Sequence, residues 1–125
     1  LHLLKLMQKY QVFTLVFSSS ATVYGSPATV PITEDFPLSV TNPYGATKLA
    51  IEGMLKWCDK AHGIHYVALR YFNAAGSNQD VGIGEDHSPE SHLIPLVMKT
   101  ALGQRSHIGI FGDDYPTPDG TCVRD

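Results

Sequence analysis

Residues 12–20, VFTLVFSSS, decide the fold of this 125-residue chain. From Val12 to Phe17 the run is apolar except for Thr14, and three serines follow it directly. A short, nearly continuous apolar run is typical of a strand covered on both faces of a parallel sheet. Ser18, Ser19 and Ser20 then stand where such a strand ends, which is where α/β proteins place functional loops. The stretch therefore predicts a parallel α/β sheet with polar groups at its carboxyl edge.

The segment after this strand predicts a loop and then a long helix. Glycine and several prolines punctuate residues 24–43, as expected of a loop. Asn42 and Pro43 are typical of a helix cap and a first helical position, and Gly63 is a typical helix end. The helix carries an apolar stripe that includes Trp57, which we expect to pack the helix onto the sheet.

The remaining elements are predicted in the same way. Residues 1–10 have apolar side chains at helical spacing, and residues 65–71 predict a second strand, which completes a right-handed parallel crossover. Beyond them we predict a polar loop, a helix over residues 93–102 and a strand over residues 107–111. We divide the chain into residues 1–73 and 74–125.

Tyr44 and Lys48 are the first candidates for chemistry. Residues four apart on a helix project from the same face, and a nearby ammonium stabilises a phenolate, so the pair can act as a base. The helix N-terminus adds positive potential near Tyr44. A serine hydroxyl from the strand end completes a set of groups that moves a proton on an alcohol while a cofactor takes the hydride. The alternative is an exposed tyrosine beside a solvated lysine.

Composition narrows the function classes. The net charge is −3 and charged residues are 17% of the chain, which argues against a nucleic-acid or anionic-membrane surface. No apolar run reaches the ~18 residues of a membrane span, and the first residues do not resemble a signal peptide. Cys58 and Cys122 lack metal spacing, so we expect free thiols in the cytoplasm. We expect no metal site, because the following histidines show no ligand spacing: His2, His62, His65, His87 and His107.

Four stretches carry a family resemblance: FSSSATVYG at 17–25, NPYGATK at 42–48, LRYFNAAG at 69–76 and GDDYPTPDGTCVRD at 112–125. Together they resemble the extended short-chain dehydrogenase/reductase family, and the last narrows the resemblance to its nucleotide-sugar 4-epimerases. The resemblance covers essentially the whole chain. It implies a Rossmann-like doubly wound parallel sheet that binds NAD, with residues 1–73 as the end of that domain and 74–125 as the start of a UDP-sugar region. No glycine-rich strand-to-helix turn occurs, so we expect an internal fragment that lacks the N-terminal glycine-rich half and the C-terminal end.

The resemblance also implies roles for particular residues. Tyr44 would take the proton from the sugar 4-hydroxyl, Lys48 would hold the nicotinamide ribose, and Ser20 would hydrogen-bond the sugar oxygen. The implied cofactor contacts are Ser18, Ser20, Tyr44, Lys48 and Phe72. The implied substrate contacts, besides Ser20 and Tyr44, are Thr22, Asn73, His92, Leu93, Ile110, Phe111 and Arg124.

The implied activity is that of an isomerase which interconverts UDP-glucose and UDP-galactose through a 4-keto sugar, acting as a homodimer. A dehydratase of the same family would carry Asp-Glu where this chain has Ala21 and Thr22. Two alternatives stay open: a 4-epimerase for another UDP-sugar, and an inactive nucleotide-sugar-binding fragment.

Overall fold

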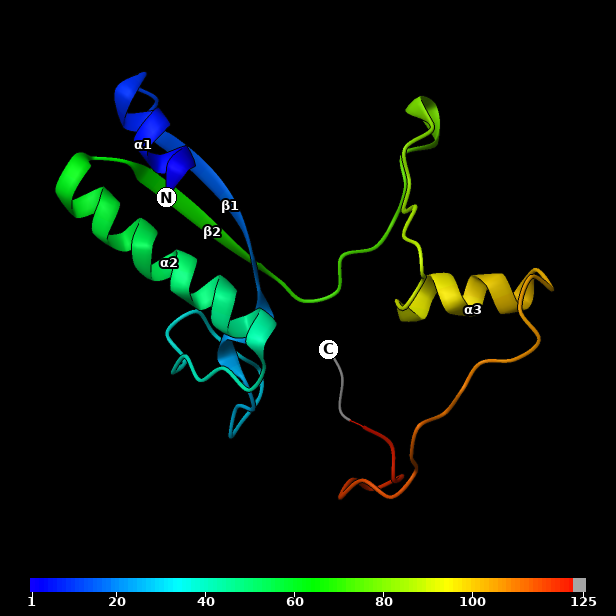
Figure 1. Ribbon diagram of the computed structural model, residues 1–125. Coiled ribbons are helices and arrows are strands. Elements are labelled where there is room, and N and C mark those ends of the chain that lie inside the picture. Colours follow the sequence, from blue (N-terminus) through cyan, green and yellow to red (C-terminus); the bar gives the residue numbers. More distant parts are fainter. Residues whose placement is uncertain (123–125) are drawn as a thin grey trace. The chain divides into compact units, whose positions relative to one another are not determined.

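The computed structural model describes residues 1–122 and divides the chain into two compact units, residues 1–72 and residues from 73 onward. The first unit contains α1 (His2–Lys9), β1 (Thr14–Ser20), the short 3-10 helix η1 (Ala21–Tyr24), α2 (Pro43–His62) and β2 (His65–Tyr71) (Figure 1). The second contains η2 (Gln79–Val81) and α3 (Leu93–Ala101).

The predicted strand–helix–strand unit is confirmed. β1 and β2 pair in parallel, with Thr14 beside His65 at one end and Ser20 beside Tyr71 at the other. The Asn42 side chain caps α2 by accepting a hydrogen bond from the Gly45 backbone N–H at 2.7 Å. Gly63 ends the helix with a φ of 68°, a left-handed conformation that glycine adopts without strain.

The inward face of α2 differs from the predicted stripe. Gly45, Glu52 and Leu55 are its buried residues, whereas Trp57 is 65% exposed. At 100° per residue, Trp57 lies about 140° around the helix from Glu52, which turns it away from the sheet. The prediction that Trp57 packs the helix onto the sheet was therefore wrong.

Helix α2 covers one face of the two-stranded sheet within the described residues. Ser19 and Arg70 lie on the face that meets Glu52 of α2. Side chains alternate along a strand, so the neighbouring residues point to the other face. There Val16 is 63% exposed and Val67 is 55% exposed. One face of this two-stranded sheet therefore remains uncovered in the described part of the chain.

The second unit confirms one predicted element and corrects another. Helix α3 lies where the apolar run predicted it, and Gly103 follows with a φ of 70°. Residues 107–111 form no strand within residues 1–122, and Ile110 and Phe111 are almost fully exposed. A strand forms only where a neighbouring strand satisfies its backbone groups, and no described segment pairs with these residues.

No helix within residues 1–122 combines the length and the apolar character that crossing a bilayer requires.

Candidate active site

Tyr44 and Lys48 lie side by side on the first turns of α2. The Lys48 ammonium nitrogen is 5.5 Å from the centre of the Tyr44 ring and 5.2 Å from the centre of the Phe17 ring. It donates a hydrogen bond to the Ser18 backbone carbonyl at 2.9 Å. The Tyr44 side chain is more than half exposed. The pair therefore combines a phenol open to solvent with a cation fixed against the end of β1.

The three serines at the end of β1 have different environments. Ser18 is exposed, Ser19 is buried and its hydroxyl donates to Glu52 Oε1 at 2.5 Å, and Ser20 is buried as the cap of η1. The Ser20 hydroxyl oxygen accepts hydrogen bonds from the Thr22 backbone N–H at 3.3 Å and from the Thr22 hydroxyl at 3.0 Å. The simple alternation that would give Ser18 and Ser20 the same surroundings ends at Ser20, because the chain turns there into η1.

Helix α2 approaches η1 closely at Gly45, next to Tyr44. A β-carbon built on Gly45 would lie 2.8 Å from the Thr22 backbone carbonyl oxygen, which is closer than real β-carbons come. Only glycine therefore allows this approach, which brings the start of α2 against the loop that follows Ser20. No sequence pattern indicated this role for Gly45.

We predict that Gly45→Ala destabilises the protein. Alanine normally stabilises a helix interior by about 0.5–1 kcal/mol over glycine, but here the overlap with the Thr22 carbonyl forces a shift that costs about 1–3 kcal/mol. Urea unfolding of the variant measures the change. Gly53→Ala is the matched control on the same helix, since nothing lies within 4 Å of its added β-carbon. Equal gains in stability for both variants would contradict the close approach.

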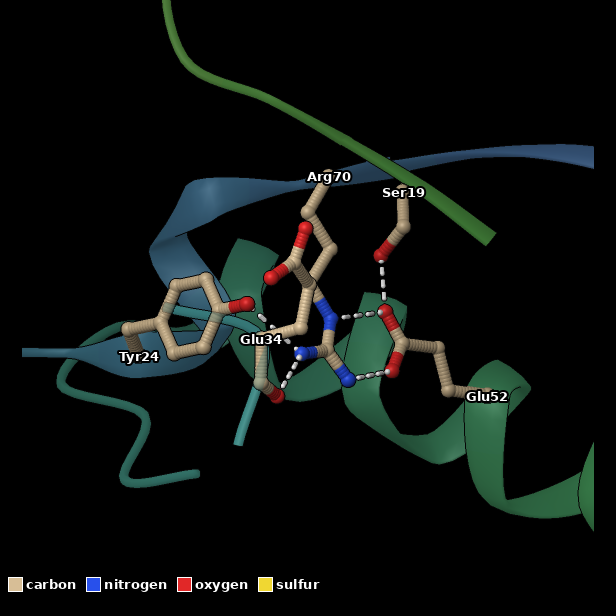
Figure 2. A network of polar contacts seen from close by, with 5 residues as sticks. All are labelled: Ser19, Tyr24, Glu34, Glu52 and Arg70. Carbon is tan, nitrogen blue, oxygen red and sulfur yellow. Dashed lines mark hydrogen bonds and ion pairs between the residues drawn. The ribbon is translucent and has the colours of Figure 1, made fainter. Parts of the chain in front are cut away.

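A buried ion pair lies beneath these residues (Figure 2). Arg70 Nη2 is 2.7 Å from Glu52 Oε2, and Arg70 Nε donates to Glu52 Oε1 at 3.1 Å. Arg70 Nη1 donates to the Tyr24 hydroxyl at 2.8 Å and to the Glu34 backbone carbonyl at 3.3 Å. The side chains of Arg70 and Glu52 are only 19% and 8% exposed.

Both side chains of this pair are stabilised in their charged forms. Burial opposes ionisation of Glu52, but the hydrogen bonds from Arg70 and Ser19 and the Arg70 charge outweigh it, so the pKa of this carboxyl lies below its usual value. The hydrogen bond to Glu52 raises the pKa of Arg70 further above its usual range, against the effect of burial. Sequence reasoning missed both residues.

The second unit contains a cluster that spacing alone did not reveal. The ligating atoms of Glu85, His87, Glu90 and His92 all lie within 4.8 Å of one another, although no metal spacing was recognised. His92 Nδ1 contacts Glu85 Oε1, and the rings of His87 and His92 are stacked with their centres 5.0 Å apart. Glu90 accepts hydrogen bonds from the backbone N–H groups of Ser91 and His92, each at 2.8 Å. Such donors suit a divalent cation, but the ion pairs between these four side chains account for the cluster.

We predict a pH-sensitive contact at His92. The Glu85 hydrogen bond and charge raise the pKa of His92 above its usual 6.5. Since protonated His92 is favoured when folded, the contact contributes fully below about pH 6.5 and is lost as the pH rises through the higher, folded pKa. An NMR titration of the imidazole should show a raised midpoint that Glu85→Gln lowers and Asp86→Asn leaves in place. An unchanged midpoint in Glu85→Gln would contradict the contact.

The other predicted site residues fall into both units. Phe72 follows β2 directly and is about half exposed. Asn73 opens the second unit, Leu93 is the first residue of α3, and Ile110 and Phe111 are exposed. Arg124 lies outside the described residues. Within the first unit, the structure brings Tyr44, Lys48, Ser20 and Thr22 to the end of β1 and the start of α2.

Two parallel strands linked by a helix, with Tyr44 and Lys48 on the first turns of that helix, give a Rossmann-like α/β arrangement. The model of the NAD dependent epimerase/dehydratase family matches residues 1–125, and the chain belongs to this family. The predicted fold class and family are confirmed.

Several similar proteins are named as 4-epimerases. Over 123 residues the chain is 60% identical to a UDP-glucose 4-epimerase of Halalkalibacterium halodurans. This alignment covers 98% of this chain and 37% of that protein. A UDP-glucose 4-epimerase from Bifidobacterium longum, solved in complex with NAD+ and UDP, has a TM-score of 0.89 and 47% identity, covering 98% of this chain and 38% of that one. A UDP-Glc/GlcNAc 4-epimerase from Campylobacter jejuni has a TM-score of 0.69 and 39% identity, covering 96% and 37%. The chain thus spans little more than a third of the length of these relatives.

Proposed function

We propose that this chain is part of a UDP-glucose 4-epimerase that interconverts UDP-galactose and UDP-glucose. The observation that carries the proposal is the Tyr44–Lys48 pair, with the ammonium 5.5 Å from the phenol ring and anchored on the Ser18 carbonyl. Tyr44 removes the proton of the sugar 4-hydroxyl, and the Lys48 charge favours the phenolate that accepts it. Ser20 orients the sugar oxygen from the end of β1. The likeness to proteins named UDP-glucose 4-epimerase supports the substrate class.

The residues at this site fit NAD as the cofactor. A lysine ammonium has three N–H donors, and the Ser18 carbonyl takes one from Lys48, which leaves donors for the hydroxyls of a ribose. Phe72 and Ser18 are exposed near the strand ends, where an α/β sheet binds its nucleotide. When bound, NAD would supply a reversible acceptor for the hydride of the sugar C4, and Lys48, Ser18 and Phe72 would hold it. Tyr44 holds the proton of the 4-hydroxyl in the interval and gives it back to the oxygen.

The second unit supplies the proposed contacts to the nucleotide sugar. We assign Asn73, His92 and Leu93 to the diphosphate and sugar. We assign Ile110 and Phe111 to the uracil and Arg124 to the phosphates, where a guanidinium binds oxygens in pairs. The Thr22 hydroxyl donates a hydrogen bond to the Ser20 hydroxyl oxygen, and we assign Thr22 as a further contact to the sugar.

The same proposal includes the cell location and assembly. Both cysteines are free, which suits the cytoplasm. We propose a homodimer formed through α2, whose outer face exposes Trp57.

A second candidate is an epimerase that also accepts N-acetylated UDP-sugars, favoured by the likeness to the Campylobacter jejuni UDP-Glc/GlcNAc 4-epimerase. A dehydratase is disfavoured, since Ala21 and Thr22 provide no carboxylate after the strand serines.

The test is turnover by the full-length protein that contains this chain. We expect conversion of UDP-galactose to UDP-glucose, measured by separating the two nucleotide sugars. Conversion of UDP-N-acetylglucosamine as well would establish the second candidate. Conversion of neither substrate, in a folded protein supplied with NAD+, would overturn the proposal.

A further inference from the structure

The Glu52–Arg70 pair joins every element of the first unit that carries a proposed reacting group. Glu52 belongs to α2, four residues after Lys48 and eight after Tyr44. Its carboxylate accepts a hydrogen bond from Ser19, the residue before Ser20 on β1. Arg70 belongs to β2, where it is the register partner of Ser19, and it binds the Tyr24 hydroxyl at the end of η1. Figure 2 shows the guanidinium between the Tyr24 hydroxyl and the Glu52 carboxylate.

The Glu52–Arg70 pair fixes the relative orientation of two elements more than it adds to the stability of the fold. Burying two charges carries a desolvation cost, and apolar side chains of similar volume often fill such a site equally well. A planar guanidinium bound to both oxygens of one carboxylate, however, fixes the distance and the orientation of the two elements. Here both Glu52 oxygens and three Arg70 nitrogens are engaged, so neither side chain can turn without breaking a bond.

The proposed reaction depends on the relative orientation of these elements. Tyr44 and Lys48 come from a helix, and Ser20 from the end of a strand, so the fit between α2 and β1 sets how the phenol and the serine hydroxyl meet one sugar oxygen. Two hydrogen bonds hold the end of β1 against α2, and we call this contact the junction. Lys48 binds the Ser18 carbonyl on its exposed side, and Glu52 binds Ser19 on its buried side. Misplacing a catalytic group by about 1 Å costs about 10²-fold in rate.

We propose that Glu52 and Arg70 are positioning residues for the epimerisation, and that they act by holding the end of β1 against α2 through Ser19. This inference rests on the proposed function. Glu52 and Arg70 take no proton from the substrate and touch no reacting atom. Their removal lowers kcat while substrate binding by the second unit is retained.

The test compares Glu52→Gln with wild type in the full-length protein. Glutamine keeps the length of the side chain but has one acceptor oxygen in place of two. It cannot accept both the Arg70 Nη2 bond and the two bonds that reach Oε1 from Ser19 and Arg70 Nε. We expect kcat to fall about 10- to 100-fold and KM for UDP-galactose to change by less than about 3-fold. Glu34→Gln is the matched control, because Arg70 binds only the backbone carbonyl of Glu34 and kcat should stay at the wild-type value.

Loss of stability alone is tested by Leu55→Ala. Leu55 is buried on the same helix but does not belong to the ion-pair network, so its truncation weakens the fold and leaves the junction with Ser19 intact. Both variants are assayed well below their melting temperatures. We expect Leu55→Ala to keep the wild-type kcat. An equal fall of kcat in Leu55→Ala and Glu52→Gln would overturn the positioning role.

The outcomes separate this inference from the proposed function. An active wild type with an unchanged kcat in Glu52→Gln overturns the positioning role alone. A folded wild type that converts no UDP-sugar overturns the proposed function and this inference with it.

Discussion

Replacing Tyr44 by phenylalanine in the full-length protein should lower kcat for UDP-galactose by about 10²–10⁴-fold. The variant keeps the ring beside the Lys48 ammonium and removes only the hydroxyl that exchanges the proton. KM should change little, because the UDP-sugar contacts proposed for the second unit remain. Initial rates of UDP-glucose formation measure the effect.

A second tyrosine controls for the chemical change itself. Tyr10 is exposed at the end of α1, and Tyr10→Phe should leave kcat at the wild-type value. If Tyr44→Phe retained most of the activity, another group would be the base, and the central part of the proposed function would be wrong.

Replacing Arg70 by methionine should lower the free energy of unfolding by about 3–5 kcal/mol, because it leaves the Glu52 carboxylate buried without its partner. The Tyr24 hydroxyl and the Glu34 carbonyl lose their donor as well. Urea denaturation of the full-length protein, followed by circular dichroism, measures the change.

The double variant Glu52→Leu/Arg70→Met tests whether the lost stability comes from the unpaired buried charge of Glu52. Two apolar side chains of similar volume leave no buried charge, so most of the lost stability should return. A double variant less stable than Arg70→Met would contradict this account of the site. Recovered stability with a kcat that stays low would agree with the positioning role.

The local structure of the first unit could be predicted because it depends on residue types that act on their immediate neighbours in the sequence. Asn42, Pro43 and Gly63 define both ends of a 20-residue helix through a side-chain cap, a fixed φ and a left-handed φ. The apolar run before Ser18 predicted β1 for the same kind of reason. The strand predicted at residues 107–111 failed because a strand also needs a partner, which its own sequence does not provide.

The ion pair and the close approach at Gly45 depend on packing between elements, which sequence patterns show only indirectly. Glutamate on a helix is usually solvent-exposed, so Glu52 drew no attention, although it lies seven residues from Gly45 and three from Leu55 on the inward face. An arginine inside the largely apolar strand 65–71 was the signal that a buried carboxylate should exist. The cluster at Glu85, His87, Glu90 and His92 follows from the path of a loop, which spacing rules for metals do not describe.

The most direct test of the account is the fate of hydrogen at the sugar C4. The full-length protein would be given UDP-galactose carrying deuterium on C4, and the UDP-glucose formed in ordinary water would be analysed by mass spectrometry and NMR. If Tyr44 exchanges only the hydroxyl proton and the C4 hydrogen travels as a hydride within the site, the product keeps its deuterium on C4. Replacement of the deuterium by hydrogen from water would contradict this, since it would mean that the carbon itself is deprotonated.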